Sequence, residues 1–254
     1  MPAHPSLETS EENLWMKLGW HPSAHQMSQF NNLQSLLRDW NARINLTRLV
    51  EGDDYWIAQI FDSLWPLRRE LADPSKRRRC IDVGTGGGFP GLAIAIAMPG
   101  AELTLVDSVK RKTHAVGAMA RELGLSSRVH VRNERIEQTG QNPSFRGHFD
   151  LAMARAVGSA PVVAEYLIPL LNSSGEALLF RGLWRSKDEE ELVAAISALN
   201  AYLCCIQPMN LPEDRGIRHV VRLKSKGICP DVFPRPIGTP AKCPLGVQPL
   251  ESLS

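Results

Sequence analysis

The stretch DVGTGGGFPG, residues 82–91, places an acid before four glycines within five positions and ends in Phe-Pro-Gly. It follows a short apolar run that starts at Cys80 and precedes an alanine- and isoleucine-rich segment that reaches Met98. A strand, a glycine-rich turn and a helix in this order bring backbone N–H groups and a helix N-terminus to one point. The stretch therefore predicts an α/β fold with a ligand site at this turn.

Short apolar runs alternate with helical patterns through the rest of the chain. The runs that we expect as strands are residues 80–84, 102–107, 128–132, 149–156, 175–182, 202–208 and 217–224. Strands that alternate with helices indicate a parallel sheet with helices on both faces. No helical pattern separates the last two runs, so we expect them to pair as an antiparallel hairpin at one edge.

The chain divides into three parts by its pattern. From Phe30 to Ile44 apolar residues recur at helical spacing, which predicts an N-terminal helical segment, residues 1–75. Pro74 and a basic run break that pattern, and we expect the main domain over residues 76–224. Six prolines without apolar periodicity predict an extended or disordered tail over residues 225–254.

Composition narrows the class of protein. Apolar residues make up 43% and charged residues 22% of the 254 residues, which is typical of a folded globular protein with one main domain. The apolar run beside the glycines stops well short of the roughly 20 residues that cross a bilayer. The first residues lack the basic patch and apolar stretch of a secretory signal. We expect a cytoplasmic protein with no membrane partner.

Metal and nucleic-acid signals are weak in the overall composition. The five cysteines form no C-x-x-C pair and the seven histidines are scattered, so we expect no structural metal. A net charge of +2 does not by itself indicate nucleic-acid binding. The local evidence for nucleic-acid binding is two basic runs, residues 76–79 and 110–112. The alternative for each run is that its charges face water and bind no nucleic acid.

Three ligand classes compete for the glycine turn. Nucleoside triphosphates are disfavoured because no Lys-Ser or Lys-Thr pair follows the glycines. Dinucleotides are disfavoured because the third glycine position, counted from Gly84, holds Phe89. S-adenosylmethionine remains, since it needs close backbone approach, which Gly84 and Gly86 allow, and an acid for its ribose.

Two acids are candidates for the donor site. Asp107 ends the next expected strand and can accept hydrogen bonds from both ribose hydroxyls, although it could instead cap the helix ahead of Val109. Asp82 lies in a buried strand, where an unpaired carboxylate is costly, and the sulfonium or amino group of the donor would favour its charge. N–H groups of its own loop are the alternative partners for Asp82.

The methyl acceptor is constrained by the motifs that the chain lacks. Methylation at cytosine C5 requires a cysteine nucleophile, and no Pro-Cys pair occurs. The Asp/Asn-Pro-Pro-aromatic turn of exocyclic-amine methylation is replaced by Ala154-Arg155-Ala156. An acceptor with a free lone pair, such as guanine N7, needs only positioning and electrostatics. A carboxylate or a small molecule remains open as acceptor.

A set of motifs carries a family resemblance. Its members are Asn45-Leu46-Thr47, Asp62-Ser63-Leu64, the glycine stretch, LVDSVKRK at residues 105–112, Ala154-Arg155-Ala156 and Arg181-Gly182. Together they resemble the RsmG family, also called glucose-inhibited division protein B, the bacterial 16S rRNA guanine-N7 methyltransferases. The resemblance covers residues 30–223.

The resemblance implies a fold and an activity. The fold is that of class I S-adenosylmethionine-dependent methyltransferases, Rossmann-like, with a mainly parallel seven-stranded sheet and an N-terminal helical extension. The activity is methyl transfer from S-adenosylmethionine to one guanine in the decoding-region loop of 16S rRNA or of the small ribosomal subunit. We expect the enzyme to be a monomer. Alternatives are a methyltransferase for a small molecule or protein, a noncatalytic ribosome-associated factor, and an NAD-linked oxidoreductase.

The resemblance also implies residues of the donor site. Gly84 and Phe89 would line the donor pocket, with Asp107 and Ser108 on the ribose side. Ile136 and Glu137 would flank the adenine.

Basic residues are implied on the acceptor side. Arg155 would close the site near donor and target base as the catalytic residue, and an ion pair with a nearby acid is its alternative. RNA phosphates would meet Lys110, Arg111, Lys112 and Arg181. The family commonly has Arg-His where this chain has Ala58-Gln59, which puts an RNA contact of that helix in doubt.

Overall fold

A computed structural model of the protein describes residues 10–247. The ends of the predicted helical segment and of the predicted tail, residues 1–9 and 248–254, lie outside the described residues.

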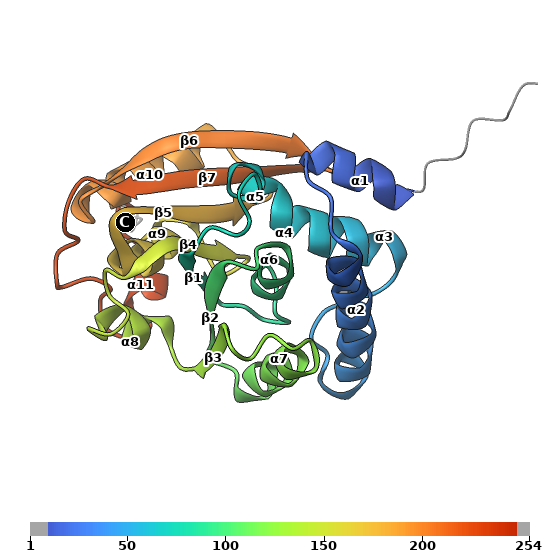
Figure 1. Ribbon diagram of the computed structural model, residues 1–254. Coiled ribbons are helices and arrows are strands. Elements are labelled where there is room, and N and C mark those ends of the chain that lie inside the picture. Colours follow the sequence, from blue (N-terminus) through green and yellow to red (C-terminus); the bar gives the residue numbers. More distant parts are fainter. Residues whose placement is uncertain (1–9, 248–254) are drawn as a thin grey trace, which may run out of the picture.

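One seven-stranded sheet forms the centre of the molecule (Figure 1). Its strands are β1 (Arg78–Val83), β2 (Ala101–Asp107), β3 (Val129–Asn133), β4 (Phe149–Arg155), β5 (Leu171–Arg181), β6 (Ala201–Asn210) and β7 (Ile217–Ser225). They lie in the order β3-β2-β1-β4-β5-β7-β6, and β7 runs opposite to the other six strands. The predicted mainly parallel sheet and the antiparallel hairpin at its edge are confirmed.

Helices cover both faces of the sheet (Figure 1). One face carries α6 (Gly91–Ala97) and α7 (Lys110–Glu122), and the other carries α8 (Ile136–Gln141), α9 (Ala160–Leu167) and α10 (Ser186–Ala198). Successive strand side chains point to opposite faces, so Leu105 joins the first core and Val106 the second. Both cores are apolar and fully packed, which fixes the register of each strand.

The N-terminal helices pack onto the α6 face. They are α1 (Ser10–Leu18), α2 (Ala24–Ile44), α3 (Gly52–Tyr55), the π-helical turn η1 (Trp56–Phe61), α4 (Asp62–Leu64), the 3₁₀ turn η2 (Trp65–Leu67) and α5 (Arg68–Leu71). Ser23 caps α2 in a capping box with Gln26, and the predicted stripe of Phe30, Leu33 and Leu37 is buried in the first core. The helical extension therefore shares the core of the sheet.

The chain after β7 differs from the prediction. Residues 226–247 pack beside α8 and α9 and include a short helix, α11 (Thr239–Lys242), and a buried Phe233. The sequence predicts an extended or disordered tail, because residues 225–254 are rich in proline and show no apolar periodicity. The segment packs instead through single side chains whose partners are far away in the sequence, such as Arg235, which donates a hydrogen bond to Glu165.

The remaining short element is the 3₁₀ turn η3 (Ile168–Leu170), which joins α9 to β5. Within residues 10–247 no helix combines the length and apolar character needed to span a membrane.

Candidate active site

The glycine turn is fixed against two neighbouring strands. The N–H groups of Gly84 and Thr85 donate to the carbonyl of Val106 at 2.8 and 3.0 Å, which ties the turn to β2. Gly84 has φ +72°, and a Cβ there would lie 2.5 Å from a methyl group of Val157. Only glycine allows the end of β1 to lie this close to the loop after β4.

Asp82 lies beneath the turn and is fully buried. Its Oδ2 accepts hydrogen bonds from the Thr85 hydroxyl at 2.7 Å and the Gly91 N–H at 2.9 Å, while Oδ1 has no partner in the described chain. Burial raises the pKa of Asp82 to about 6. Groups of the loop therefore hydrogen-bond to one oxygen of the Asp82 carboxylate, as the alternative to a donor contact predicted. A contact between Asp82 and the donor stays a prediction.

Asp107 links the turn to the start of α7. Its Oδ2 accepts from the Gly86 N–H at 2.9 Å, and its Oδ1 accepts from the Val109 N–H at 2.8 Å. The helix-cap alternative is wrong, because the N-cap of α7 is Val109 and this helix has no side-chain cap hydrogen bond. Each carboxylate oxygen has two lone pairs, so Asp107 can still accept hydrogen bonds from a ribose while it holds both N–H groups.

A pocket of about 490 Å³ opens where β1 to β4 end. Among the predicted donor residues, Gly84, Asp107, Ser108 and Ile136 line it. Its volume lies within the range of about 300 to 1,000 Å³ that is usual for small-molecule sites. An apolar wall at Ile136 and an acid at Asp107 fit the adenine and ribose of an adenosine group.

The pocket also has walls that sequence reasoning missed. They include Glu134 and Arg135 after β3, Val162 and Tyr166 from α9, and Ala241 from α11. No motif of the glycine turn points to these positions, since they come from segments that meet only in the folded chain.

The Glu137 side chain is held between the C-terminal segment and α9. It is 2% exposed, and Oε1 accepts from the Gly238 N–H at 2.9 Å and the Tyr166 hydroxyl at 3.4 Å. The carboxylate therefore faces the C-terminal segment and does not line the pocket. A contact of the Glu137 backbone with the adenine edge remains a prediction.

Phe89 and Arg155 lie together, next to the N-terminal helices. The Phe89 ring is buried edge-to-face against Tyr55 at 6.4 Å between centroids, and the Arg155 guanidinium carbon lies 5.9 Å from its centroid. Neither residue lines the 490 Å³ pocket, so their contact with the donor stays a prediction.

The N-terminal helices hold Arg155 at the end of β4. Its guanidinium donates to the Ala58 carbonyl at 3.0 Å and to the Gln59 side-chain oxygen. It also pairs with Asp62 at 3.3 Å, which is the predicted alternative for this residue. Burial lowers the pKa of Arg155, and the charge of Asp62 opposes this. Arg155 stays a cation, because an arginine does not lose its proton in proteins.

The backbone on both sides of this contact is unusual. Ala156, directly after Arg155, has φ +57°, a left-handed conformation that is uncommon outside glycine. Ala58 and Gln59 lie in the π-helical turn η1, a form that often occurs at functional sites. Both features place the guanidinium against η1.

Two residues next to Arg155 and Asp62, namely Gln59 and Arg218, were not identified as site residues from the sequence. The Gln59 side-chain amide donates to the Thr47 hydroxyl at 3.1 Å, so Gln59 connects Arg155 to the Asn-Leu-Thr motif. The Nε atom of Arg218 lies 3.8 Å from Oδ1 of Asp62. The sequence marked Gln59 only as a departure from Arg-His, because its partners are 12 and 96 residues away.

The predicted RNA-binding residues lie along one rim of the sheet. Lys110 and Arg111 are exposed at the start of α7, and Lys112 is half-buried. Arg181 ends β5 and donates to the Gly158 carbonyl at 2.6 Å. Because β2 and β5 are three strand spacings apart, the carboxyl ends of these two strands are about 14 Å apart along the rim. Their contact with RNA stays a prediction.

A metal centre is not formed by the described residues. Among residues 10–247, no three His, Cys, Asp or Glu side chains come together to hold an ion. His21 and His25 share the four-residue spacing of some ligand pairs, but only His25 lies in α2.

Known proteins match both the sequence and the fold. A family model for rRNA small subunit methyltransferase G (GidB) matches residues 26–215. Relatives named ribosomal RNA small subunit methyltransferase G are 64% identical in Prochlorococcus marinus (strain MIT 9313), over 92% of this chain and 94% of theirs, and 58% identical in Synechococcus sp. (strain WH7803), over 98% of each. An O-methyltransferase from Bacillus cereus in complex with SAH shares the fold at a TM-score of 0.55 and 15% identity, over 76% of this chain and 90% of that one. The predicted class I methyltransferase fold is confirmed, and the chain belongs to the rRNA small subunit methyltransferase G family.

Proposed function

We propose that the protein transfers a methyl group from S-adenosylmethionine to N7 of one guanine in the decoding-region loop of 16S rRNA. Family membership carries this proposal, since it establishes a methyltransferase of small-subunit rRNA. The pocket that follows the glycine turn supports the donor, and the adjacent cation Arg155 supports the acceptor. A cytoplasmic, monomeric enzyme without a structural metal is part of the proposal.

The donor site uses backbone and side-chain groups that follow the ends of β1, β2 and β3. Gly84 lines the pocket, and Asp107 offers free lone pairs to ribose hydroxyls. Ile136 forms the apolar wall for adenine, with Ser108 beside the ribose. Hydrogen bonds to Gly86 and Val109 hold the Asp107 carboxylate in place before any ligand arrives, which reduces the entropy lost on binding.

The acceptor side uses Arg155 for orientation. When bound, S-adenosylmethionine supplies an electrophilic methyl group, which guanine N7 can accept through its lone pair without loss of a proton. No general base is required, and Arg155 cannot serve as one. Arginine commonly donates to both O6 and N7 of guanine. Because N7 must stay free to react, Arg155 would donate to O6 or to a neighbouring phosphate.

Methyl transfer to small-subunit rRNA tests the proposal. The protein is incubated with S-adenosylmethionine labelled in its methyl group and with small subunits or deproteinised rRNA that lack the modification. Large-subunit rRNA serves as the matched control. We expect label in small-subunit rRNA only. Equal labelling of both RNAs, or labelling of neither, would contradict the proposed substrate.

A further inference from the structure

The segment after β7 lies outside the part of the chain that the family model matches, which ends at residue 215. Residues 228–243 of this segment, here called the C-terminal brace, lie between α8 and α9 (Figure 1). All seven strands of the sheet precede these residues, and the brace packs against helices.

The brace is fixed to α9 through a buried ion pair. Arg235 donates from Nε at 2.9 Å and from Nη2 at 2.6 Å to Glu165, and its backbone N–H donates to the same carboxylate at 2.8 Å. Glu165 is fully buried. A buried carboxylate is stable only when it is paired and hydrogen-bonded, so this joint holds the brace to α9.

The brace contacts α8 at three positions. Gly238 donates its N–H to Glu137 at 2.9 Å, and the Gln141 amide donates to the Pro234 carbonyl at 2.8 Å. Gly140 packs directly under Pro234, where a Cβ would lie 2.7 Å from the proline ring. Because α8 is only six residues long, these contacts fix its position.

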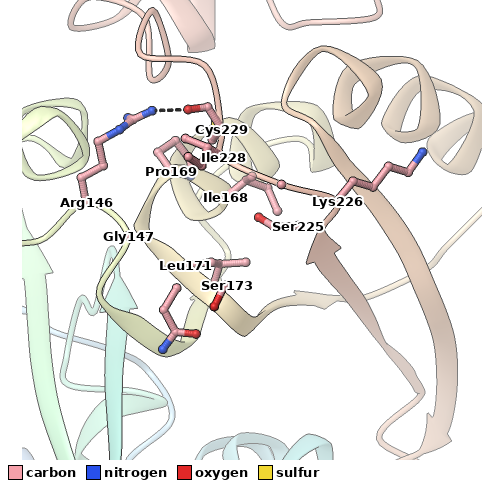
Figure 2. A pocket seen from close by; sticks show the side chains of 12 residues that line it. Arg146, Gly147, Ile168, Pro169, Leu171, Ser173, Ser225, Lys226, Ile228 and Cys229 are labelled. Carbon is pink, nitrogen blue, oxygen red and sulfur yellow. Dashed lines mark hydrogen bonds between the residues drawn. The ribbon is translucent and has the colours of Figure 1, made fainter.

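The start of the brace is also fixed. Figure 2 shows Arg146 turned across a second pocket toward Cys229. Its guanidinium donates to the carbonyls of Cys229 at 2.7 Å, Pro230 at 3.0 Å and also Phe233. Three carbonyls on one guanidinium hold this part of the chain rigidly.

The two helices that the brace joins are two walls of the donor pocket. Ile136 from α8 and Tyr166 from α9 both line it, and Ala241 of the brace lines it directly. We propose that the C-terminal brace sets the width of the donor pocket and that Ala241 contacts the bound donor. This inference rests on the proposed donor. It makes Ala241 a binding residue, and Arg235 and Gly140 positioning residues.

A substitution at Ala241 tests the direct contact. Ala241→Trp fills the pocket from the brace, and Lys242→Trp places the same side chain on the next exposed residue as a control. Calorimetry should give a Kd for S-adenosylmethionine at least tenfold higher for Ala241→Trp and within twofold of the original for Lys242→Trp. Equal affinity of the Ala241→Trp protein would overturn the contact.

A substitution at Gly140 tests the positioning role without touching the pocket. Gly140→Ala puts a methyl group against Pro234, whereas Gly117→Ala, in α7, meets no atom within 4 Å. We expect the Gly140→Ala protein to bind S-adenosylmethionine three- to tenfold more weakly and to exchange the Gly238 amide hydrogen faster. The Gly117→Ala protein should match the original in both measurements. Unchanged affinity and exchange in Gly140→Ala would overturn the positioning role.

Measurements on the original protein distinguish a failure of this inference from a failure of the proposed function. In that protein, S-adenosylmethionine should slow hydrogen exchange across the brace, because the ligand and the brace stabilise each other. If the unchanged protein does not bind S-adenosylmethionine, the proposed function fails and the inference fails with it. If it binds and methylates rRNA while exchange in the brace is unaffected, only the inference fails.

Discussion

Asp82 should make the stability of the protein depend on pH in a way that Asp82→Asn removes. The carboxyl group is fully buried, and burial raises its pKa from 3.8 to about 6. Between these pH values the folded protein holds a proton that the unfolded chain has released. The stabilisation is therefore fully present below about pH 4 and is lost as the pH rises through 6.

The magnitude follows from the gap between the two pKa values of Asp82. The gap is about two pH units, which corresponds to roughly 3 kcal/mol of unfolding free energy. Between pH 4.5 and pH 7.5, about 2 kcal/mol of this should be lost, since part of the titration lies below pH 4.5.

Urea unfolding of the original protein and of Asp82→Asn at both pH values measures the effect. Asparagine cannot ionise, so effects of other groups cancel in the difference between the two proteins. Relative to the original, the variant should gain about 2 kcal/mol of unfolding free energy when the pH is raised from 4.5 to 7.5. The same difference at both pH values would refute the reasoning that burial holds the proton on Asp82.

Four further substitutions test the site. Arg155→Ala should lower methyl transfer at least a hundredfold, because the acceptor loses its orienting cation, and near-original turnover would remove its assigned role. Asp107→Ala should weaken donor binding by about 1.5 to 3 kcal/mol in calorimetry, and an unchanged Kd would leave Asp107 only as the acceptor for the Gly86 and Val109 N–H groups. Lys110→Ala and Arg111→Ala should each reduce the slope of log K for rRNA binding against log salt concentration by about the amount expected for one phosphate contact. An unchanged slope would mean that these residues are only solvated.

Most of the fold could be predicted because its signals are local. Each parallel strand is a short apolar run, and helices such as α2 and α7 carry an apolar stripe, so the seven strands and the hairpin between β6 and β7 follow from pattern alone. The short helix α8 has no such stripe and was not predicted. The glycine turn marks one end of the site, since Gly84 is needed for both its φ and the close approach of Val157.

The rest of the site depends on contacts between distant segments. Gln59 and Asp62 reach Arg155 from the N-terminal helices, 96 and 93 residues away. Ala241 reaches the donor pocket from a proline-rich segment in which no apolar periodicity indicates packing. Such residues have no local pattern, because their surroundings are set by the tertiary structure.

The identity of the methylated atom tests the central claim most directly. After methyl transfer to unmodified small-subunit rRNA, treatment with borohydride and then aniline cuts the chain at N7-methylguanine. A single new cut in the decoding-region loop, absent without the protein, is the predicted result. Incorporated methyl label without any new cut would contradict methylation at guanine N7.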